Sequence, residues 1–183
     1  MKKFTAIALV LTIALSLLAG CGAEKTPATE APAQEAVKVE GTMEELLNKV
    51  IEIQPVEFMG GVIGIDLTDT SEDGLWTIKA FTGLDNADLI SEAAVFEPMM
   101  GSIPYSMVLV RAADAANAEA VADAMKAGID QRKWICVEAD DLLVTACGDV
   151  VMLIMVNSEN GMTAQSFVDA FQTVCGADLD FTI

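Results

Sequence analysis

The most regular apolar pattern in the chain is residues 150–156, where seven consecutive positions are apolar. A strand with no polar side is typical of the centre of a sheet that is covered on both faces. Residues 142–147 form a second apolar strand, and Gly148-Asp149 between the two is a two-residue hairpin turn. Residues 105–111, rich in valine and leucine, predict a third strand. The hairpin makes this part of the sheet antiparallel.

Three other segments carry apolar residues at helical spacing. The sequence Thr-Met-Glu-Glu that starts at Thr42 is a capping box, because the Thr42 hydroxyl and the Glu45 carboxylate can each accept from a backbone N–H at a helix start. It predicts a helix that ends at Pro55. Residues 114–132 predict a second helix, and a third helix ends at Gly176.

The remaining segments follow no single period. Residues 58–74 alternate glycines with valine and isoleucine before turning polar, and residues 76–81 fit either a short strand or a turn of helix. Residues 93–96 predict a short extended run that ends at Pro98. The coarse order alternates strand pairs with helices, which predicts an α+β fold. We expect a two-layer sandwich, a mainly antiparallel sheet with helices packed on it.

The first twenty residues have the layout of a secretory signal. Lys2 and Lys3 precede an apolar stretch, residues 4–18, and small residues follow it. The sequence Leu-Ala-Gly-Cys that ends at Cys21 resembles the bacterial lipobox. That resemblance implies diacylglycerol on the Cys21 thiol and cleavage just before this residue. An ordinary signal peptide with a chance cysteine and an uncleaved membrane anchor are the alternatives.

These features divide the chain into three parts. Residues 1–20 are a lipoprotein signal peptide, residues 21–41 a disordered acidic tether rich in proline and alanine, and residues 42–183 a single α+β domain. We expect the protein at the extracytoplasmic face of a bacterial cell membrane, held there by lipid on Cys21. Two acyl chains give stable anchoring, whereas one gives marginal binding.

Charge limits the range of partners. The net charge is −18, and because a leader with two lysines and no acidic residue is removed, that of the mature chain is −20. Such a surface is repelled by phosphate, so we expect no nucleic-acid binding. Anionic lipid is repelled as well, so the lipid on Cys21 must hold the protein at the membrane.

Residue types limit the chemistry further. The chain has no histidine, so neither Ser-His-Asp nor Cys-His catalysis is available within it. Cys136, Cys147 and Cys175 form no Cys-x-x-Cys pair, which disfavours a zinc site and a thioredoxin-type motif. We interpret these cysteines as small apolar residues, with one disulfide among them as the alternative. No metal and no cofactor is expected.

One segment imitates the start of a calcium loop. Residues 69–74 read Asp-x-Ser-x-Asp-Gly, but the twelfth position of such a loop is Ala80, where a bidentate glutamate is required. Aspartate and serine beside glycine also form ordinary turns. We therefore favour a turn here.

Paired carboxylates are the remaining route to catalysis. Asp140-Asp141, or Asp66 with Asp69, are the candidate pairs for a hydrolase. A chain with 28 acidic residues contains neighbouring acids by chance. Catalytic carboxylates also need environments that separate their pKa values, and sequence does not reveal these.

Four segments occur in an order found in a known group of proteins. They are residues 92–96 (EAAVF), 105–110 (YSMVLV), 120–125 (AVADAM) and 142–151 (LLVTACGDVV). With the lipobox and the tether, they resemble the uncharacterised bacterial lipoproteins of domain-of-unknown-function family 4358, over roughly residues 84–171. The resemblance implies a lipid-anchored exported domain of a Gram-positive anaerobe and carries over no catalytic residue. Residues 58–81 depart from the family pattern.

The favoured function is a non-enzymatic binding or accessory module of the cell envelope with an unidentified protein partner. A contact surface could include Met59, Met99, Met100, Tyr105 and Trp134, although core or loop packing is the favoured role of these side chains. A ligand-capturing lipoprotein associated with a transporter is one alternative, and a carboxylate-based hydrolase is the other.

Overall fold

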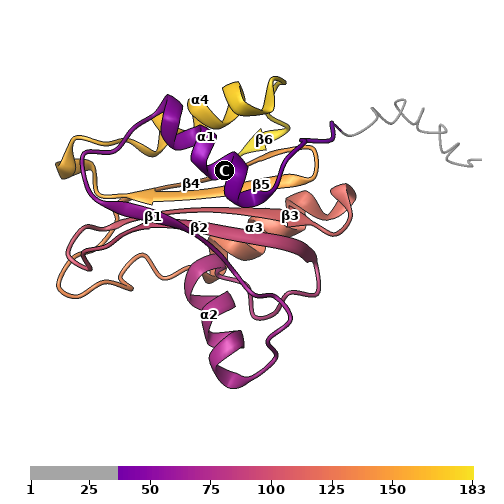
Figure 1. Ribbon diagram of the computed structural model, residues 1–183, viewed down its shortest axis with the longest axis horizontal. Helices are drawn as coiled ribbons and strands as arrows, with labels where there is room; N and C mark the ends of the chain where they lie inside the picture. Colours follow the sequence, from indigo (N-terminus) through magenta and orange to yellow (C-terminus); the bar gives the residue numbers. More distant parts are fainter. Residues whose placement is uncertain (1–36) are drawn as a thin grey trace, which may run out of the picture. The chain divides into compact units, whose positions relative to one another are not determined.

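Six strands form one antiparallel sheet, in the order β1-β2-β3-β5-β4-β6, in the computed structural model (Figure 1). The structure describes residues 37–183, so Cys21, the predicted signal peptide and most of the predicted tether lie outside the described residues. The strands are β1 (Gly60–Gly64), β2 (Ile90–Pro98), β3 (Tyr105–Ala112), β4 (Asp141–Cys147), β5 (Val150–Val156) and β6 (Phe181–Thr182). The helices are α1 (Met43–Ile53), α2 (Glu72–Thr82), α3 (Ala118–Gly128) and α4 (Ala164–Cys175), with short 3-10 helices η1 (Ala115–Asn117) and η2 (Ser158–Asn160).

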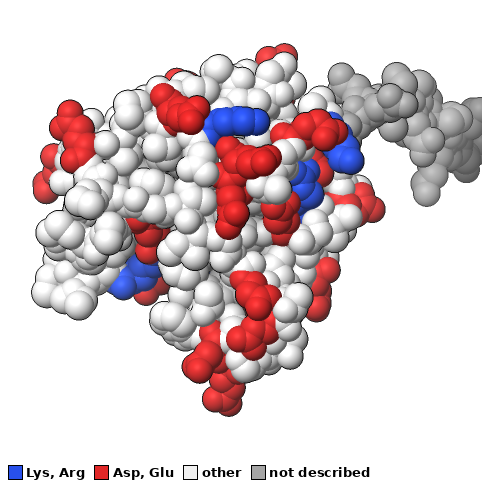
Figure 2. Space-filling model, viewed as in Figure 1, with Lys and Arg blue, Asp and Glu red and all other residues white. Residues whose placement is uncertain are grey.

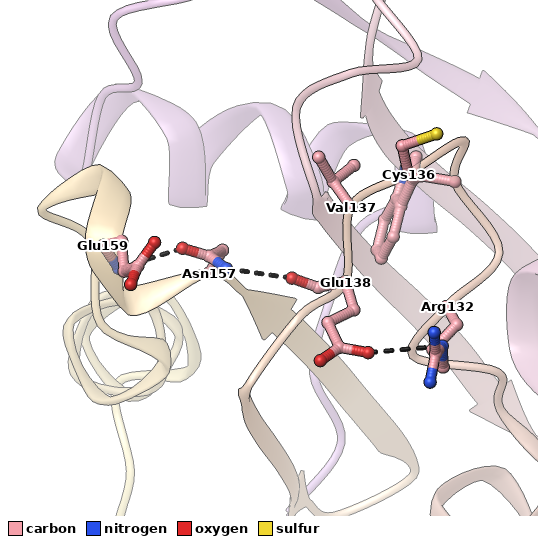
Figure 3. A pocket seen from close by; sticks show the side chains of 7 residues that line it. Arg132, Cys136, Val137, Glu138, Asn157 and Glu159 are labelled. Atoms are coloured by element: carbon pink, nitrogen blue, oxygen red, sulfur yellow. Dashed lines mark hydrogen bonds and ion pairs between the residues drawn. The ribbon is translucent and has the colours of Figure 1, made fainter.

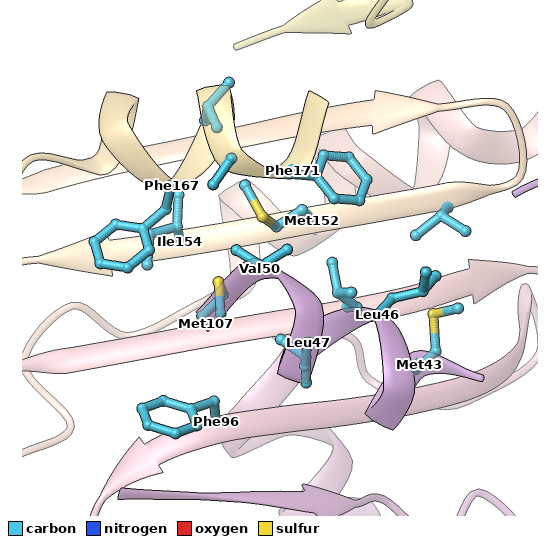
Figure 4. Close-up of a cluster of buried hydrophobic side chains, with 14 of the residues drawn as sticks. Met43, Leu46, Leu47, Val50, Phe96, Met107, Met152, Ile154, Phe167 and Phe171 are labelled. Atoms are coloured by element: carbon cyan, nitrogen blue, oxygen red, sulfur yellow. The ribbon is translucent and has the colours of Figure 1, made fainter. Parts of the chain in front are cut away.

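Helices cover both faces of this sheet. α1 and α4 pack on one face, where their apolar side chains meet those of the sheet (Figure 4), and α2 and α3 pack on the other (Figure 1). In β3 and β5, Met107 and Met152 face the first pair of helices, while Val108 and Leu153 face the second. The α+β class, with an antiparallel sheet and helices packed on it, is confirmed. The layers number three where two were expected, because the two central strands are apolar on both faces.

Most predicted elements form where the sequence places them. The hairpin of β4 and β5 turns at Gly148, whose φ of 58° is in the left-handed region that glycine adopts freely. The capping box at Thr42 is present, with Glu45 N donating to the Thr42 hydroxyl at 3.2 Å and Thr42 N donating to Glu45 Oε2 at 3.1 Å. α4 ends at Gly176 in the left-handed conformation, as expected.

The helix predicted for residues 114–132 is shorter in the structure. Asp114 caps η1 by accepting from Ala116 N at 3.0 Å, and α3 then ends at Gly128. A Cβ at Gly128 would lie 2.0 Å from the carbonyl oxygen of Gly83, the left-handed C-cap of α2. The two helices therefore meet at their glycine ends, and the chain leaves α3 at this contact.

β1 is the strand that periodicity did not reveal. It contains three glycines in five residues, so it shows no alternation of apolar and polar side chains. Gly60 is required by packing, since a Cβ there would lie 2.5 Å from the Phe96 ring. That ring belongs to an aromatic cluster in which Tyr105 meets Phe58, Phe96 and Phe167 at centroid distances of 5.1, 5.8 and 5.3 Å. Residues 72–82, in contrast, take the helical alternative.

Arg111 fixes the start of the described chain to the sheet. Its Nη1 lies 2.5 Å from Asp149 Oδ2 in the β4–β5 turn and donates to the Val39 carbonyl at 3.2 Å. Its Nη2 donates to the Gly41 carbonyl at 2.6 Å. One guanidinium therefore joins a turn of the sheet to the segment that leads into α1.

A second carboxylate extends this network into the helix. Glu92 Oε2 lies 3.6 Å from Arg111 Nε, while Glu92 Oε1 accepts from Met43 N, the first residue of α1, at 2.9 Å. A carboxylate at a helix start interacts favourably with the helix dipole. The position of α1 on the sheet is consequently set by charges as well as by its apolar face.

Replacing Arg111 should cost stability because it leaves Asp149 and Glu92 without their partner in a largely buried setting. We expect Arg111→Met to lower the free energy of unfolding by about 2–3 kcal/mol. Arg132→Met is the matched control, because Arg132 pairs with Glu138 but its side chain is 80% exposed, and we expect a loss below about 0.5 kcal/mol. Urea unfolding followed by tryptophan fluorescence measures both, and equal losses would contradict the role assigned to Arg111.

Candidate functional site

The calcium-like segment forms the N-terminus of α2. Asp69 Oδ1 accepts from Ser71 N at 2.9 Å, and Ser71 is the N-cap, whose hydroxyl accepts from Gly74 N at 3.2 Å. The hydrogen bonds from Ser71 hold the pKa of Asp69 below its ordinary value. These contacts are those of a turn followed by a helix cap, as the sequence favoured.

The other candidate carboxylates likewise accept from nearby backbone groups. Asp66 accepts from Thr68, which lowers its pKa. Asp140 accepts from the Ser158 amide and hydroxyl at 2.7 and 2.6 Å, contacts that lower the Asp140 pKa, whereas Asp141 accepts from Ala164 N at 2.7 Å. The structure thus directs Asp140 to η2 and Asp141 to α4, and it brings neither proposed pair together in a shared apolar cleft.

The three described cysteines occupy different environments. Cys147 is buried and Cys175 is partly buried against the same core, and both are free thiols. Burial raises the pKa of both thiols. The interpretation as small apolar residues fits this pair. It is wrong for Cys136, which is exposed.

A buried charge cluster that sequence reasoning missed lies on the α2 and α3 face. Lys133 Nζ is 2.5 Å from Glu97 Oε1, and it donates to Ser106 Oγ at 3.2 Å and to the Ala80 carbonyl at 3.3 Å. The ammonium also lies 5.1 Å from the centroid of the Phe81 ring. Nothing in the sequence signals this cluster, because its members come from four separate segments.

A serine hydrogen-bonded to a lysine can act as a nucleophile with its general base. The surroundings of Ser106 and Lys133 decide whether this pair has that role. A lysine acts as a base only when it is neutral. Burial lowers the pKa of Lys133, but the Glu97 carboxylate opposes that shift and favours the charged form. Ser106 has no exposed surface. The contacts therefore favour a structural tie between the sheet, α2 and the loop after α3.

Two surface hollows of the described residues have the volume of a small-molecule site. One, of about 450 Å³, is shown in Figure 3 and is lined by Arg132, Trp134, Cys136, Val137, Glu138, Asn157 and Glu159. Its polar groups bond to one another, since Arg132 Nε lies 3.2 Å from Glu138 Oε2 and Asn157 Nδ2 donates to the Glu138 carbonyl at 3.0 Å. The other, of about 550 Å³, lies between the end of α1, the β2–β3 loop and the residues after η2. Among the residues that line the two hollows, no hydrogen bond joins a thiol or hydroxyl to a carboxylate.

The strongest candidate is an uncharged surface around β1. Of the five residues named from sequence as a contact surface, Tyr105 is fully buried and Trp134 is half-buried, but the three methionines are exposed. Met59, Met99 and Met100 are 76%, 75% and 62% exposed, and Met99 N donates to the Met59 carbonyl at 2.9 Å. Core or loop packing was the favoured role for these methionines; the three lie in loops, and their exposure excludes the core. We call β1 with these three methionines the β1-edge surface.

β1 presents one side of its backbone to solvent. The pairs Met59–Met99 and Ile65–Ala93 are hydrogen-bonded, so in an antiparallel ladder the groups of residues 61 and 63 also point to β2. The N–H and C=O groups of Gly60, Val62 and Gly64 therefore point outward. Within residues 37–183, no backbone partner lies on that side.

Charge changes sharply along this surface. Residues 58–65 carry no charge. The residues on either side of them, 50–57 and 66–78, contain six acidic residues and no lysine or arginine. Figure 2 shows acidic side chains over much of this face and a largely uncharged area at its left end, where β1 begins and the β2–β3 loop lies in Figure 1. An uncharged run of eight residues between acids was the available sequence signal for this surface.

Comparison with known proteins adds no relative, because no family model, no curated protein and no solved structure matches the chain. The resemblance to domain-of-unknown-function family 4358 stays a prediction. Among the described residues, no helix has the length and apolar character needed to cross a membrane. The same part of the chain holds no group of three or more potential ligands placed to bind a metal ion.

Lys133→Met should destabilise the protein because it leaves the Glu97 carboxylate buried without its partner. We expect a loss of about 3 kcal/mol in the free energy of unfolding. The double variant Glu97→Leu with Lys133→Met removes both charges and should regain most of that loss, as measured by urea unfolding. A double variant no more stable than Lys133→Met alone would show that the charge pair is not the cause.

Proposed function

We propose that this chain is a lipid-anchored protein of the bacterial cell envelope that binds another protein and is not an enzyme. The observation that carries this proposal is the β1-edge surface, an exposed apolar area on a chain whose net charge is −18. Solvent-exposed apolar patches of this kind mark interaction sites, and methionine side chains adapt to different partners. We also propose that the chain belongs to domain-of-unknown-function family 4358, which its sequence resembles.

The placement of the chemistry-bearing residues supports a binding role over a hydrolase. Asp66, Asp69, Asp140 and Asp141 are engaged as turn and cap acceptors, and Lys133 is paired with Glu97. Groups held in this way stabilise local structure and are not arranged around a common reacting atom.

The geometry of chain entry also suits an anchored binding module. The segment before α1 is held at the Arg111 end of the sheet, close to Glu92 near the start of β2. The exposed methionines lie beyond Pro98, at the other end of β2. A strand of this length spans about 25 Å. The described chain therefore enters at the end of β2 opposite to the exposed methionines, which leaves these methionines free for a partner.

The anchor is tested by replacing Cys21, which lies outside the described residues. We expect Cys21→Ser protein to lose labelling by a clickable palmitate analogue in growing cells and to leave the membrane fraction or remain unprocessed, because the thiol is the acceptor of the lipid. Cys136→Ser is the matched control, since Cys136 is exposed and should not affect anchoring. Normal processing, labelling and membrane retention of Cys21→Ser protein would contradict the proposal.

Binding is tested on the same membranes. After cross-linking and detergent extraction, the wild-type chain should co-purify with one consistent envelope protein. Repeated recovery of the chain alone would weaken the binding role while leaving the anchor intact.

A further inference from the structure

We infer that the free edge of β1 binds a partner segment as an added β-strand, and that this segment is an apolar extended stretch of a protein flanked by lysine or arginine. The inference rests on the proposed binding function and names the kind of partner that the surface fits. Main-chain hydrogen bonds supply the affinity in this mode of recognition, and alternate side chains supply the specificity.

The first argument is the hydrogen-bonding capacity of the edge. Gly60, Val62 and Gly64 each direct an N–H and a C=O outward, and no described residue satisfies them. Ile63 between them is 58% exposed, and a Cβ at Gly61 would meet open space. A neighbouring strand can therefore approach the backbone of β1 without displacing any of these side chains.

The second argument is that this edge lacks the usual protection. Sheet edges in soluble proteins are protected by lysine, proline, bulges or very short strands. The opposite edge follows that rule, because β6 has two residues. β1 has five residues, with glycine, valine and isoleucine as its residue types and a regular register against β2. An edge of this kind is a template for pairing.

The third argument is charge, which selects the occupant. Glu57 precedes β1, Asp66 follows it, and both are exposed. Glu44 of α1 lies over the far end of the strand, where its carboxylate would meet a Cβ at Gly64. Acidic groups at both ends of an apolar strand complement a segment with basic residues at both ends.

The same charges disfavour a second copy of this chain. In an antiparallel pair of two β1 strands centred on Val62, residue 58 of one copy lies opposite residue 66 of the other. Glu57 then comes next to Asp66 at both ends of the pair. Like charges in neighbouring cross-strand positions are destabilising, and the net charge of −18 adds further repulsion between copies.

The test uses the full chain in detergent micelles and a fluorescent peptide, Lys-Lys-Val-Thr-Val-Thr-Val-Lys-Lys. Saturable binding measured by fluorescence anisotropy is expected for this peptide. Two matched peptides should not bind: one with glutamate in place of every lysine, and one with proline in place of the first threonine and the central valine. The proline peptide has the same charge, and because its two prolines are adjacent, one of them faces β1 in either register and breaks the ladder. Equal binding of the proline peptide, or no binding of the first, overturns the inference.

The protein side is tested with Val62→Pro, which removes an outward N–H and leaves the bonds from β1 to β2 in place. Proline is tolerated on an edge strand when its N–H position faces solvent. We expect peptide affinity to fall about tenfold or more at an unchanged circular dichroism spectrum. Affinity equal to that of the wild type overturns the inference.

A second pair of variants covers the case in which Val62→Pro does not fold. Ile63→Lys adds a positive charge to the edge and should abolish binding of the lysine-flanked peptide, whereas Ile63→Thr should retain it. Equal binding by both variants overturns the inference.

Two further outcomes have defined meanings. Dimerisation of the full chain that Val62→Pro abolishes, without peptide binding, would assign the edge to a second copy and overturn the inference. A co-purifying envelope protein retained equally by wild type and Val62→Pro would leave the proposed function standing while the edge inference fails.

Discussion

The two-sided burial of β3 and β5 is the constraint on which the rest of the structure depends. All seven residues of β5 are buried, and its side chains alternate between the two apolar clusters of the molecule. Each buried aliphatic side chain contributes about 1.5–3 kcal/mol relative to exposure. Neither face of the central sheet can therefore be left to solvent, and helices must return to both. The connections of the chain, with α1 and α4 on one face and α2 and α3 on the other, follow from that requirement.

The outer strands have fewer constraints, and the proposed docking edge is one of them. At one end of the sheet, Arg111 ties the incoming chain to Asp149 and, through Glu92, fixes the start of α1. At the other end, Lys133 ties the loop after α3 to Glu97. These two charge clusters use two of the ten basic residues of the chain, Arg111 and Lys133, for internal ties. β1 itself contains no lysine or arginine that would protect the strand, and Glu57 and Asp66 lie on its two sides in the chain.

Sequence alone was sufficient for the parts of the fold in which local pattern and tertiary burial agree. β3, β4, β5, the turn at Gly148, α1 and α4 are of this kind. β1 was not predictable by periodicity, because its glycines serve a close approach to Phe96 and an open edge, and neither leaves an alternating pattern. The clusters of Arg111 and Lys133 join segments far apart in the chain, so no local sequence pattern predicts them. Of the five residues named from sequence as a contact surface, Met59, Met99 and Met100 are exposed. Tyr105, in contrast, is buried at the centre of an aromatic cluster.

Amide hydrogen exchange of β1, followed by nuclear magnetic resonance, tests most directly the claim that this strand is a free docking edge. In the full chain without peptide, the amides of Gly60, Val62 and Gly64 should exchange fast, while those of residues 61, 63 and 65 should be protected by β2. Addition of the lysine-flanked peptide should slow exchange at the three outward amides and leave the inward ones as they were. Outward amides that are protected without peptide, or that keep exchanging fast at saturation, would contradict this account of the protein.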